Sequence, residues 1–298
     1  MRLRNLILCA IVLASASIRA SDKEIADLLI KAGAQVKFEG DTAVSVLFSN
    51  KNKEEPRDPT PAQLKLAGQL KNLKSFTVYN SCPATDETFE FIDGLENLES
   101  AAINGLKLSD AGFQHFAKLK NLKKLTLWHC FNKQFNGSGS AALAELPKLE
   151  SYACDGSTFN DEGLKACAKL KQVSALHFHH TMVTDKGLEN LKGMENIKSL
   201  MLSTQFSVRI GDPALEFIAD IPNLEKLEFD ETVLTYEGGL NRLKKLTNLK
   251  ELILKDTEIA DDDMARLKTD LPNVQIGWSK PKPEQAEKMK AELAKKKK

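Results

Sequence analysis

The stretch Leu119-Lys-Asn-Leu122-Lys-Lys-Leu125-Thr-Leu127 contains the pattern on which the whole chain is built. Leucine occupies its first, fourth, seventh and ninth positions, and the last two alternate with polar residues as the buried side of a strand does. Eight segments share this frame, and a ninth, truncated copy closes the series. Their first residues are Leu70, Leu95, Leu119, Leu146, Leu170, Met194, Ile221, Leu246 and Leu271. Successive starts lie 24 to 27 residues apart, which predicts a stack of structural repeats.

A different spacing follows each strand segment. Phe113, Phe116 and Leu119 are three residues apart, which places their side chains on one face of a short helix. Pairs of a capping residue and an acid precede such segments, at Ser109-Asp110, Asn160-Asp161 and Thr184-Asp185. We expect the first residue of each pair to cap the helix and the acid to complement its dipole. Each repeat is therefore predicted to be a strand, a loop and a short helix.

The L-x-x-L-x-x-L-x-L frame resembles the strand motif of the leucine-rich-repeat family, and the repeat length lies in that family's range of roughly 20–29 residues. Glycines early in the helical segments, at Gly112, Gly163 and Gly187, resemble its helical, ribonuclease-inhibitor-like and cysteine-containing branch, in a bacterial secreted form. The resemblance covers residues 70–278. It implies an α/β solenoid, a horseshoe with a parallel β-sheet on the concave side and short helices on the convex side. The fold alone implies no particular function.

The N-terminus predicts an export signal. Arg2 and Arg4 precede an apolar run at residues 6–16, which is shorter than the roughly 20 residues of a membrane span. We expect residues 1–20 to be a signal peptide cleaved after Ala20, with Ala16 as the second site and an uncleaved anchor as the alternative. The mature protein is then secreted or periplasmic. No second apolar run approaches spanning length, so we expect no transmembrane segment in the mature chain.

The two ends of the array differ from the repeats. Residues 21–69 are expected to form an N-terminal cap with a helix, a hairpin and the helix of an incomplete repeat, and residues 70–279 the eight repeats and a closing strand. Residues 280–298 form a tail with eight lysines and three glutamates, whereas the body without signal and tail carries a net charge of −7. Three interpretations of the tail stay open: a solvated, disordered segment, an anchor to an anionic polymer, nucleic acid or lipid, and a helix docked on the acidic body.

Small polar residues recur eleven positions after each repeat start. They are Ser81, Cys130, Ser157, Thr181, Thr232 and Thr257, and Leu106 and Gln205 depart from the pattern. The family resemblance implies that they bond the loop backbone as a ladder. Cys154 and Cys167 are expected to be small core residues, which pair with each other if they pair at all. Cys82, in a loop, is predicted to be the exposed thiol.

The alternation of side chains along each strand predicts which residues face the concave side. The candidate binding residues that it presents are Tyr79, Asn104, Trp128, Asp155, His177, His179 and Asp230. An exposed Trp128 near Tyr79 is the strongest sign of a binding surface, because aromatic residues anchor many interfaces. His177 and His179 should share a face, with Asp155 beside His179 at about 4.8 Å and His180 pointing away. Two imidazoles and a carboxylate can hold a metal, but no fourth ligand is specified, so we predict neither a metal nor a cofactor.

Catalytic motifs are missing from the sequence: it has no Gly-x-Ser-x-Gly, no His-Glu-x-x-His, no phosphate loop and no dinucleotide fingerprint. We therefore expect a non-enzymatic exported protein, a monomer that binds a protein or peptide on its concave sheet and recognises no nucleic-acid sequence. The alternative is an envelope-associated structural protein attached by its basic tail. A minor alternative is a metal-dependent hydrolase that uses the histidines and aspartate of the concave face.

Overall fold

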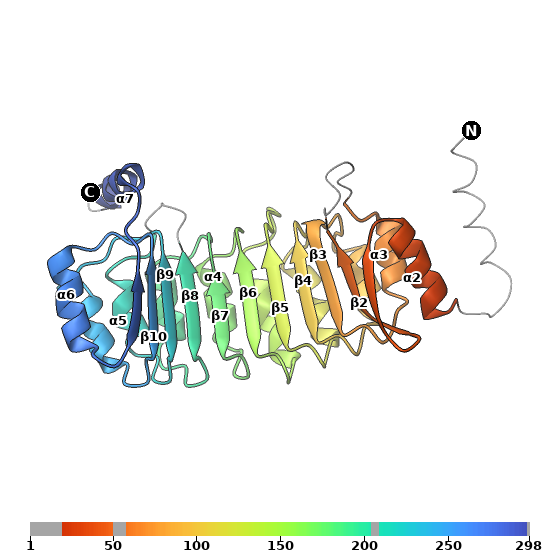
Figure 1. Ribbon diagram of the computed structural model, residues 1–298, viewed down its shortest axis with the longest axis horizontal. Helices are drawn as coiled ribbons and strands as arrows, with labels where there is room; N and C mark the ends of the chain where they lie inside the picture. The colour runs from red at the N-terminus through yellow and green to blue at the C-terminus, as the bar shows by residue number, and fades with distance from the viewer. Residues whose placement is uncertain (1–19, 50–57, 204–208, 297–298) are drawn as a thin grey trace.

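The computed structural model describes residues 20–49, 58–203 and 209–296. The predicted signal peptide, apart from Ala20, and Gln205 lie outside these residues. The described chain forms an elongated, curved stack in which elements follow one another in sequence order from end to end (Figure 1). This order is the direct result of the repeat, because each unit can bury its apolar face only against its neighbours.

One sheet runs through the whole stack. Its eleven strands lie in the order β1 to β11; β1 pairs with β2 antiparallel, and every later pair is parallel. The strands are β1 (Gln35–Glu39), β2 (Thr42–Phe48), β3 (Ser75–Ser81), β4 (Ser100–Asn104), β5 (Lys124–Trp128), β6 (Ser151–Asp155), β7 (Ala175–Phe178), β8 (Ser199–Ser203), β9 (Lys226–Asp230), β10 (Glu251–Lys255) and β11 (Gln275–Trp278). Equivalent repeat positions pair, as Leu125 with Tyr152 and Leu127 with Cys154. The fold is a leucine-rich-repeat solenoid. The predicted fold class is confirmed.

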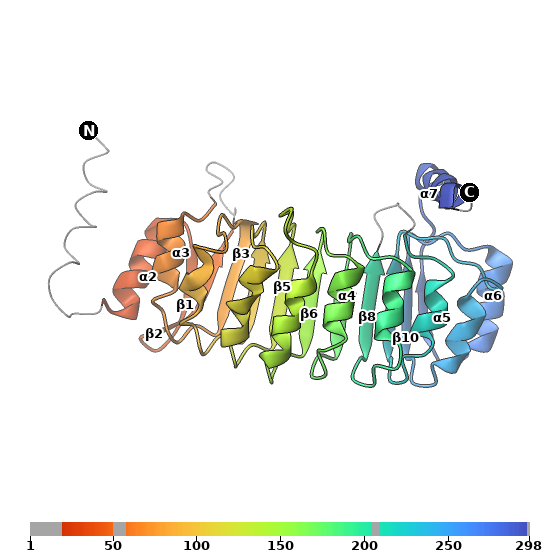
Figure 2. The ribbon, with the colours of Figure 1, turned by 180° about the vertical axis from the view of Figure 1, so that it is seen from behind.

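Short helices cover the back of the sheet (Figure 2). Five repeats use 3-10 helices: η2 (Phe89–Ile92), η3 (Ala111–Gln114) with η4 (Phe116–Lys118), η5 (Ser138–Glu145), η6 (Lys186–Leu191) and η7 (Leu240–Lys245). Three repeats use α-helices: α4 (Asp161–Cys167), α5 (Ala214–Ile218) and α6 (Asp261–Asp270). Leucines of the repeated frame, such as Leu122, Leu125 and Leu127, are fully buried between the two layers. The finer resemblance to the helical, ribonuclease-inhibitor-like branch is not confirmed.

Two of the three predicted capping residues, Asn160 and Ser109, bond an N–H at the start of their helix, and the third, Thr184, does not. The Asn160 side chain accepts a hydrogen bond from the Glu162 N–H at the start of α4. The Ser109 hydroxyl oxygen accepts the Ala111 N–H at the start of η3, whereas Thr184 does not cap η6. The backbone N–H and hydroxyl groups of Ser109 and Thr184 also donate to the carboxylates of Asp86 and Asp161, respectively, in the preceding repeats. Asp161, which was expected to complement the dipole of its own helix, therefore also binds the loop of the next repeat.

Asp110 shows the same role most fully. Its two carboxylate oxygens accept hydrogen bonds from the backbone N–H groups of Asn136, Gly137 and Gly139 at 2.9, 3.0 and 2.8 Å. Asp185 and Asp212 likewise accept from Gly211 and Thr235 of the following repeats. Because the loops have no sheet partner for these N–H groups, the carboxylates join each repeat to the next.

The described residues before the first repeat form a helix, a hairpin and a second helix. Helix α2 (Asp22–Lys31) begins at Ser21, which forms a capping box with Glu24. The β1–β2 hairpin follows, and β2 pairs with β3, the first repeat strand. Helix α3 (Pro61–Ala67) begins at Thr60 and has proline in its first turn. These elements cover the open end of the array.

The C-terminal tail is a helix, so the interpretation as a disordered segment is wrong for its described part. Helix α7 (Pro283–Lys296) buries Met289 completely, and Lys290 Nζ lies 2.7 Å from Glu258 Oε1 of the body. Apolar burial and a surface ion pair thus hold the tail against the last repeats, as the docking interpretation predicts. Whether the tail also anchors the protein to an anionic polymer stays untested.

The cysteines of the described residues, Cys82, Cys130, Cys154 and Cys167, are buried and unpaired. Cys154 and Cys167 are core residues without a bridge, but the prediction of an exposed Cys82 is wrong. The β3–β4 register shifts between Val78 and Ser81, so two extra residues enter the first repeat and Cys82 turns inward. Burial raises the pKa of the Cys82 thiol to about 11.

The polar ladder is imperfect. The Thr232 and Thr257 hydroxyls donate to backbone carbonyls, and the Ser157 hydroxyl accepts from the Phe159 N–H. Ser81 is exposed because of the inserted residues, and the buried Thr181 hydroxyl has no hydrogen-bond partner in the part of the chain that the structure describes. The ladder implied by the family resemblance therefore holds in some repeats only.

Candidate binding surface

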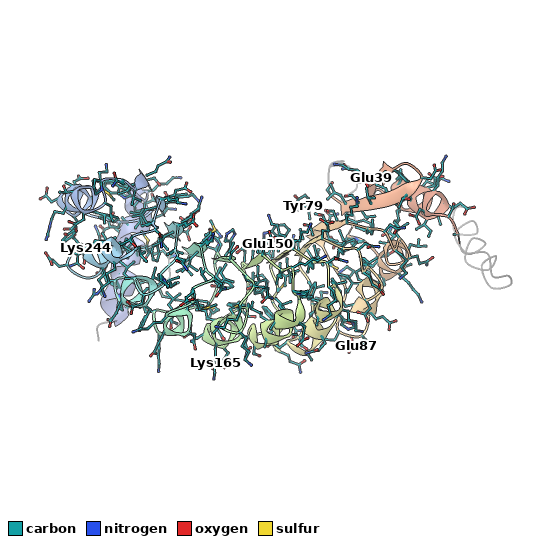
Figure 3. The ribbon with its side chains drawn as sticks, turned by 90° about the horizontal axis from the view of Figure 1, so that it is seen from below. Glu39, Tyr79, Glu87, Glu150, Lys165 and Lys244 are labelled. Atoms are coloured by element: carbon teal, nitrogen blue, oxygen red, sulfur yellow. The ribbon has the colours of Figure 1, made fainter. Side chains whose placement is uncertain are left out.

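The sheet forms the inner wall of the curve, with Tyr79 and Glu150 on its concave side and Glu87 and Lys165 on the outer side (Figure 3). Most candidate residues lie at or next to the carboxyl end of their strand: Asn104, Trp128, Asp155, His179 and Asp230. Tyr79 lies two residues before the end of β3, and His177 pairs with Ala153 one level below the strand ends. Below them, Thr77, Ala102, Thr126 and Ala153 occupy equivalent positions on four neighbouring strands. Apart from His177, the large polar and aromatic groups are thus gathered along one edge of a floor of small, uncharged residues on β3 to β6.

Tyr79 and Trp128 form an aromatic pair over β4. Their ring centroids lie 5.8 Å apart at an interplanar angle of 38°. Tyr79 is 57% exposed and Trp128 is half-buried, so Tyr79, and not the predicted Trp128, is the more accessible ring. Asn104 lies on the strand between them and donates from Nδ2 to the Tyr79 carbonyl at 2.8 Å. The pair is a rigid apolar surface with an amide beneath it.

His129 extends this surface and was missed by the sequence analysis. It has a φ of +52°, in the left-handed region, and its Nδ1 lies 2.7 Å from Asn104 Oδ1. A left-handed residue follows several strands, and glycine takes the place at Gly105 and Gly156. The left-handed backbone turns the His129 ring back toward the preceding repeat, which strand alternation alone does not predict.

Asp155 and His179 are neighbours, as the sequence predicts. The Asp155 Oδ1 accepts the His179 backbone N–H at 3.0 Å. The His179 ring reaches further along the sheet, and its Nε2 lies 3.2 Å from Oδ2 of Asp230, two repeats away. Asp230 is only 2% exposed and also receives Lys255 Nζ at 3.0 Å. Its Oδ1 has no hydrogen-bond partner among the described residues.

The prediction that His180 points away from His179 is wrong. His180 has a φ of +53°, and its ring stacks on that of His179 with centroids 3.8 Å apart. Its Nε2 lies 2.9 Å from Glu231 Oε2, and the Ser203 hydroxyl donates to the same oxygen at 3.3 Å. Two stacked imidazoles, each facing its own carboxylate, therefore form the far end of the candidate surface.

The pKa values of this cluster are shifted in different directions. The hydrogen bond to Asp230 raises the pKa of His179, whereas burial lowers the pKa of His177. Burial raises the pKa of Asp155. Burial opposes the charged form of Asp230 as well, but its hydrogen bonds to His179 and Lys255 outweigh that effect and lower its pKa. His179 and Asp230 thus favour a charged pair at the edge of the groove.

The geometry gives no support to a metal centre. In residues 20–49, 58–203 and 209–296, no group of three or more His, Cys, Asp or Glu residues is arranged to hold a metal ion. The ring of His179 is directed to Asp230 and does not share a site with His177 and Asp155, which the hydrolase alternative requires. That alternative is not pursued. Among the described helices, none combines the length and apolarity needed to cross a membrane.

Charges alternate along the opposite, amino-terminal edge of the sheet. Lys123 Nζ lies 2.8 Å from Glu99 of the preceding repeat, and Lys198 and Lys250 both reach Glu225 at 3.3 and 2.6 Å. Neighbouring repeats neutralise one another, so this edge presents no continuous basic stripe of the kind that binds a phosphate backbone.

No protein-family model and no curated protein matches the sequence. Among solved structures, the chain is similar to an internalin of Listeria monocytogenes, at 19% identity over 74% of this chain and 58% of that one, with a TM-score of 0.49. Internalin C2 of the same organism is 20% identical over 89% of this chain and 100% of its own, with a TM-score of 0.44. A leucine-rich-repeat protein of Leptospira interrogans is 16% identical over 72% of this chain and 80% of its own, with a TM-score of 0.30. The chain spans 58% of the first internalin, and these likenesses leave its ligand open.

Proposed function

We propose that this chain is a non-enzymatic binding protein that holds a protein or peptide ligand on the concave face of its sheet. The observation that carries the proposal is the exposed Tyr79–Trp128 pair at the strand ends, continued by the polar cluster around His179. Large rings fixed by neighbouring side chains bury much area on binding and lose little conformational entropy. The small residues of the floor leave room for an extended chain beside them.

The charges of the cluster support a polar contact at the far end of the groove. Asp230 is almost fully buried, and one of its oxygens lacks a partner among the described residues. This oxygen is shielded from solvent, so a ligand would meet the partly exposed His179 ring, which the hydrogen bond to Asp230 holds in place. The Tyr79–Trp128 pair would then supply apolar contact area, and the His179–Asp230 pair would orient the ligand through a polar contact.

A peptide-display selection against the immobilised protein tests the proposal. Peptides enriched on the wild type should lose about tenfold or more in affinity for Tyr79→Ala and Trp128→Ala, because each variant removes one anchor ring. Glu87→Ala and Lys165→Ala, on the convex side, are the matched controls and should change nothing. Enrichment of peptides that bind all four variants like the wild type would refute the concave site.

We further propose that the protein acts outside the cytoplasm, in the secreted or periplasmic space. The support is the N-terminal sequence, in which Arg2 and Arg4 precede the apolar residues 6–16. Sequencing the N-terminus of the protein recovered from each cell fraction tests this. A mature chain that begins at Ser21 or Ser17 in the exported fraction is expected, and a cytoplasmic chain that keeps Met1 would contradict it.

A further inference from the structure

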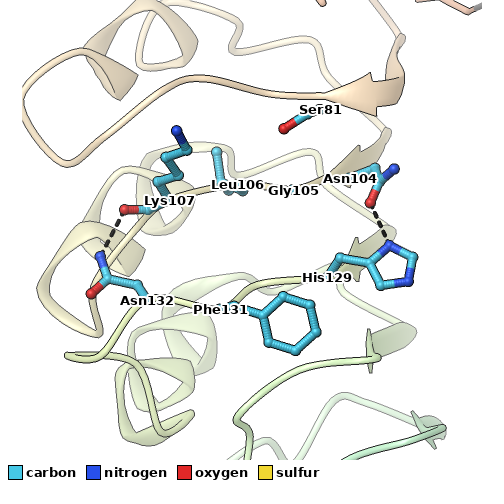
Figure 4. Close-up of a pocket in the computed structure, with 8 residues that line it drawn as sticks. All are labelled: Ser81, Asn104, Gly105, Leu106, Lys107, His129, Phe131 and Asn132. Carbon is cyan, nitrogen blue, oxygen red and sulfur yellow. Dashed lines mark hydrogen bonds between the residues drawn. The ribbon is translucent and has the colours of Figure 1, made fainter.

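A hollow lies beside the Tyr79–Trp128 pair, at the carboxyl ends of β3 to β5 (Figure 4). Its volume is about 550 Å³, which is within the range of small-ligand sites. Ser81, Gly105 and Leu106 line one side, and His129 and Phe131 line the other. None of these residues was a candidate in the sequence analysis.

The hollow depends on a glycine. Gly105 has a φ of +68°, and a Cβ at this position would lie 2.6 Å from the Ser81 hydroxyl oxygen. The equivalent position in the next repeat is His129, also left-handed, whose ring stacks on Phe131 with centroids 6.1 Å apart. Glycine therefore lets the backbone at residue 105 lie directly against Ser81 on one side of the hollow, and the His129 ring forms the opposite side.

The wall presents an apolar face to solvent. Phe131 is 65% exposed, the largest exposure among the large hydrophobic residues of the described chain. Leu106 supplies further apolar lining from the opposite side. A single exposed phenylalanine is ordinary on a protein surface, but one that lines a hollow beside a second aromatic pair offers a place for an apolar side chain.

The charge of the hollow is positive although the body of the protein is acidic. Lys107 lines it, and the Lys107 ammonium has no ion pair within the described residues. None of the described lining residues is acidic. Asp58, which accepts the Ser81 backbone N–H at 2.9 Å, is not among them. The charge therefore complements an anion.

We propose that this hollow receives the C-terminal residue of a peptide, with its apolar side chain against Phe131 and its free carboxylate at Lys107. This proposal rests on the proposed peptide binding and adds that the C-terminal residue of the peptide binds in the hollow. Asn104 and His129 line the hollow and are hydrogen-bonded to each other, and Asn104 also donates to the Tyr79 carbonyl, which links the hollow to the aromatic pair. A chain lying along the concave floor toward the carboxyl edge of the sheet would end here.

The test uses N-acetyl-L-phenylalanine as a probe, with its C-terminal amide as the uncharged counterpart. In a two-dimensional NMR titration of the full chain, up to about 10 mM probe, the backbone signals of Gly105, Leu106 and Lys107 should shift with the acid. The amide should bind at least about tenfold more weakly, because it cannot form the charged contact.

Two pairs of variants locate the contacts. Lys107→Met should weaken binding of the acid to the level of the amide, whereas Lys133→Met, an exposed lysine that does not line the hollow, should not. Phe131→Ala should weaken binding of both probes, and Met182→Ala, another exposed apolar residue, should not.

Equal affinity for acid and amide, or no shifts at these positions, would overturn the proposal. So would a stronger response to N-acetylglucosamine, which would make the hollow a sugar site. These outcomes are separate from failure of the proposed function. Selected peptides that depend on Tyr79 and Trp128, but not on Lys107 or a free C-terminus, would leave concave-face binding in place and remove only the site in the hollow.

Discussion

Replacement of Asp110 by alanine tests how the repeats are held together. The side chain receives three backbone N–H groups of the next repeat at 2.8 to 3.0 Å, in a half-buried setting. Hydrogen bonds to a charged group contribute about 1.5–3 kcal/mol each, but water can replace part of them at this depth. We expect Asp110→Ala to lower the free energy of unfolding by about 2–4 kcal/mol.

Asp110→Asn gives a sharper result than alanine alone. The amide keeps one oxygen, which can still serve Gly137 and Gly139, but its nitrogen would face the Asn136 N–H. We therefore expect a loss of roughly half that of alanine. Urea unfolding followed by circular dichroism measures both, and the slope must be compared because a repeat array can unfold in parts.

The control is Asp27→Ala, an exposed acid within α2, which should change stability by less than about 0.5 kcal/mol. The account of the repeat junction is wrong if Asp110→Ala costs no more than this control. Equal losses for Asn and Ala would show that the three short contacts do not act as separate hydrogen bonds.

Three further predictions concern the cluster, the thiols and the tail. The folded-state pKa of His179 is raised, so the stability that its charged form contributes should be complete below about pH 6.5 and lost as pH rises through the folded pKa. In urea titrations, the difference in unfolding free energy between wild type and His179→Gln should therefore shrink toward alkaline pH. Cys82 should not react with a thiol reagent at pH 8 before denaturant is added, and fast labelling of the native protein would contradict its burial. Met289→Asp should release α7 and bring rapid proteolysis within residues 280–298 while the repeats survive, whereas a tail cleaved equally fast in wild type would refute docking.

The repeat made the architecture predictable from sequence. A side-chain period of two followed by a spacing of three specifies strand and helix, and a recurrence of 24 to 27 residues specifies their stacking. The concave candidates could be named for the same reason, because alternation decides which side of a strand a residue takes. Tyr79, Trp128, Asp155 and His179 are all found where this rule places them.

The errors arise where the backbone leaves the strand rule. His129 and His180 have positive φ values at positions where other repeats have glycine, and the sequence of one repeat does not show that a histidine adopts the same conformation. Cys82 is buried because two residues are inserted in β3, a register shift that the leucine frame does not record. Contacts over two repeats, such as His179 with Asp230, were missed because only adjacent strands were considered.

The lysine-rich composition of the tail alone did not decide between its three interpretations. Its eight lysines favour a solvated segment, yet Ala286 and Met289 are three residues apart and both are buried in α7. That spacing was a usable signal of a docked helix.

Hydrogen exchange of the protein, free and bound to a selected peptide, tests the central claim most directly. If the ligand lies on the concave face, amides near the carboxyl ends of β3 to β7, around Tyr79, Trp128 and His179, should gain protection on binding. The convex helices near Glu87 and Lys165 should keep their free-state rates. Protection confined to the convex side, or none at these strand ends in a saturated complex, would contradict the account.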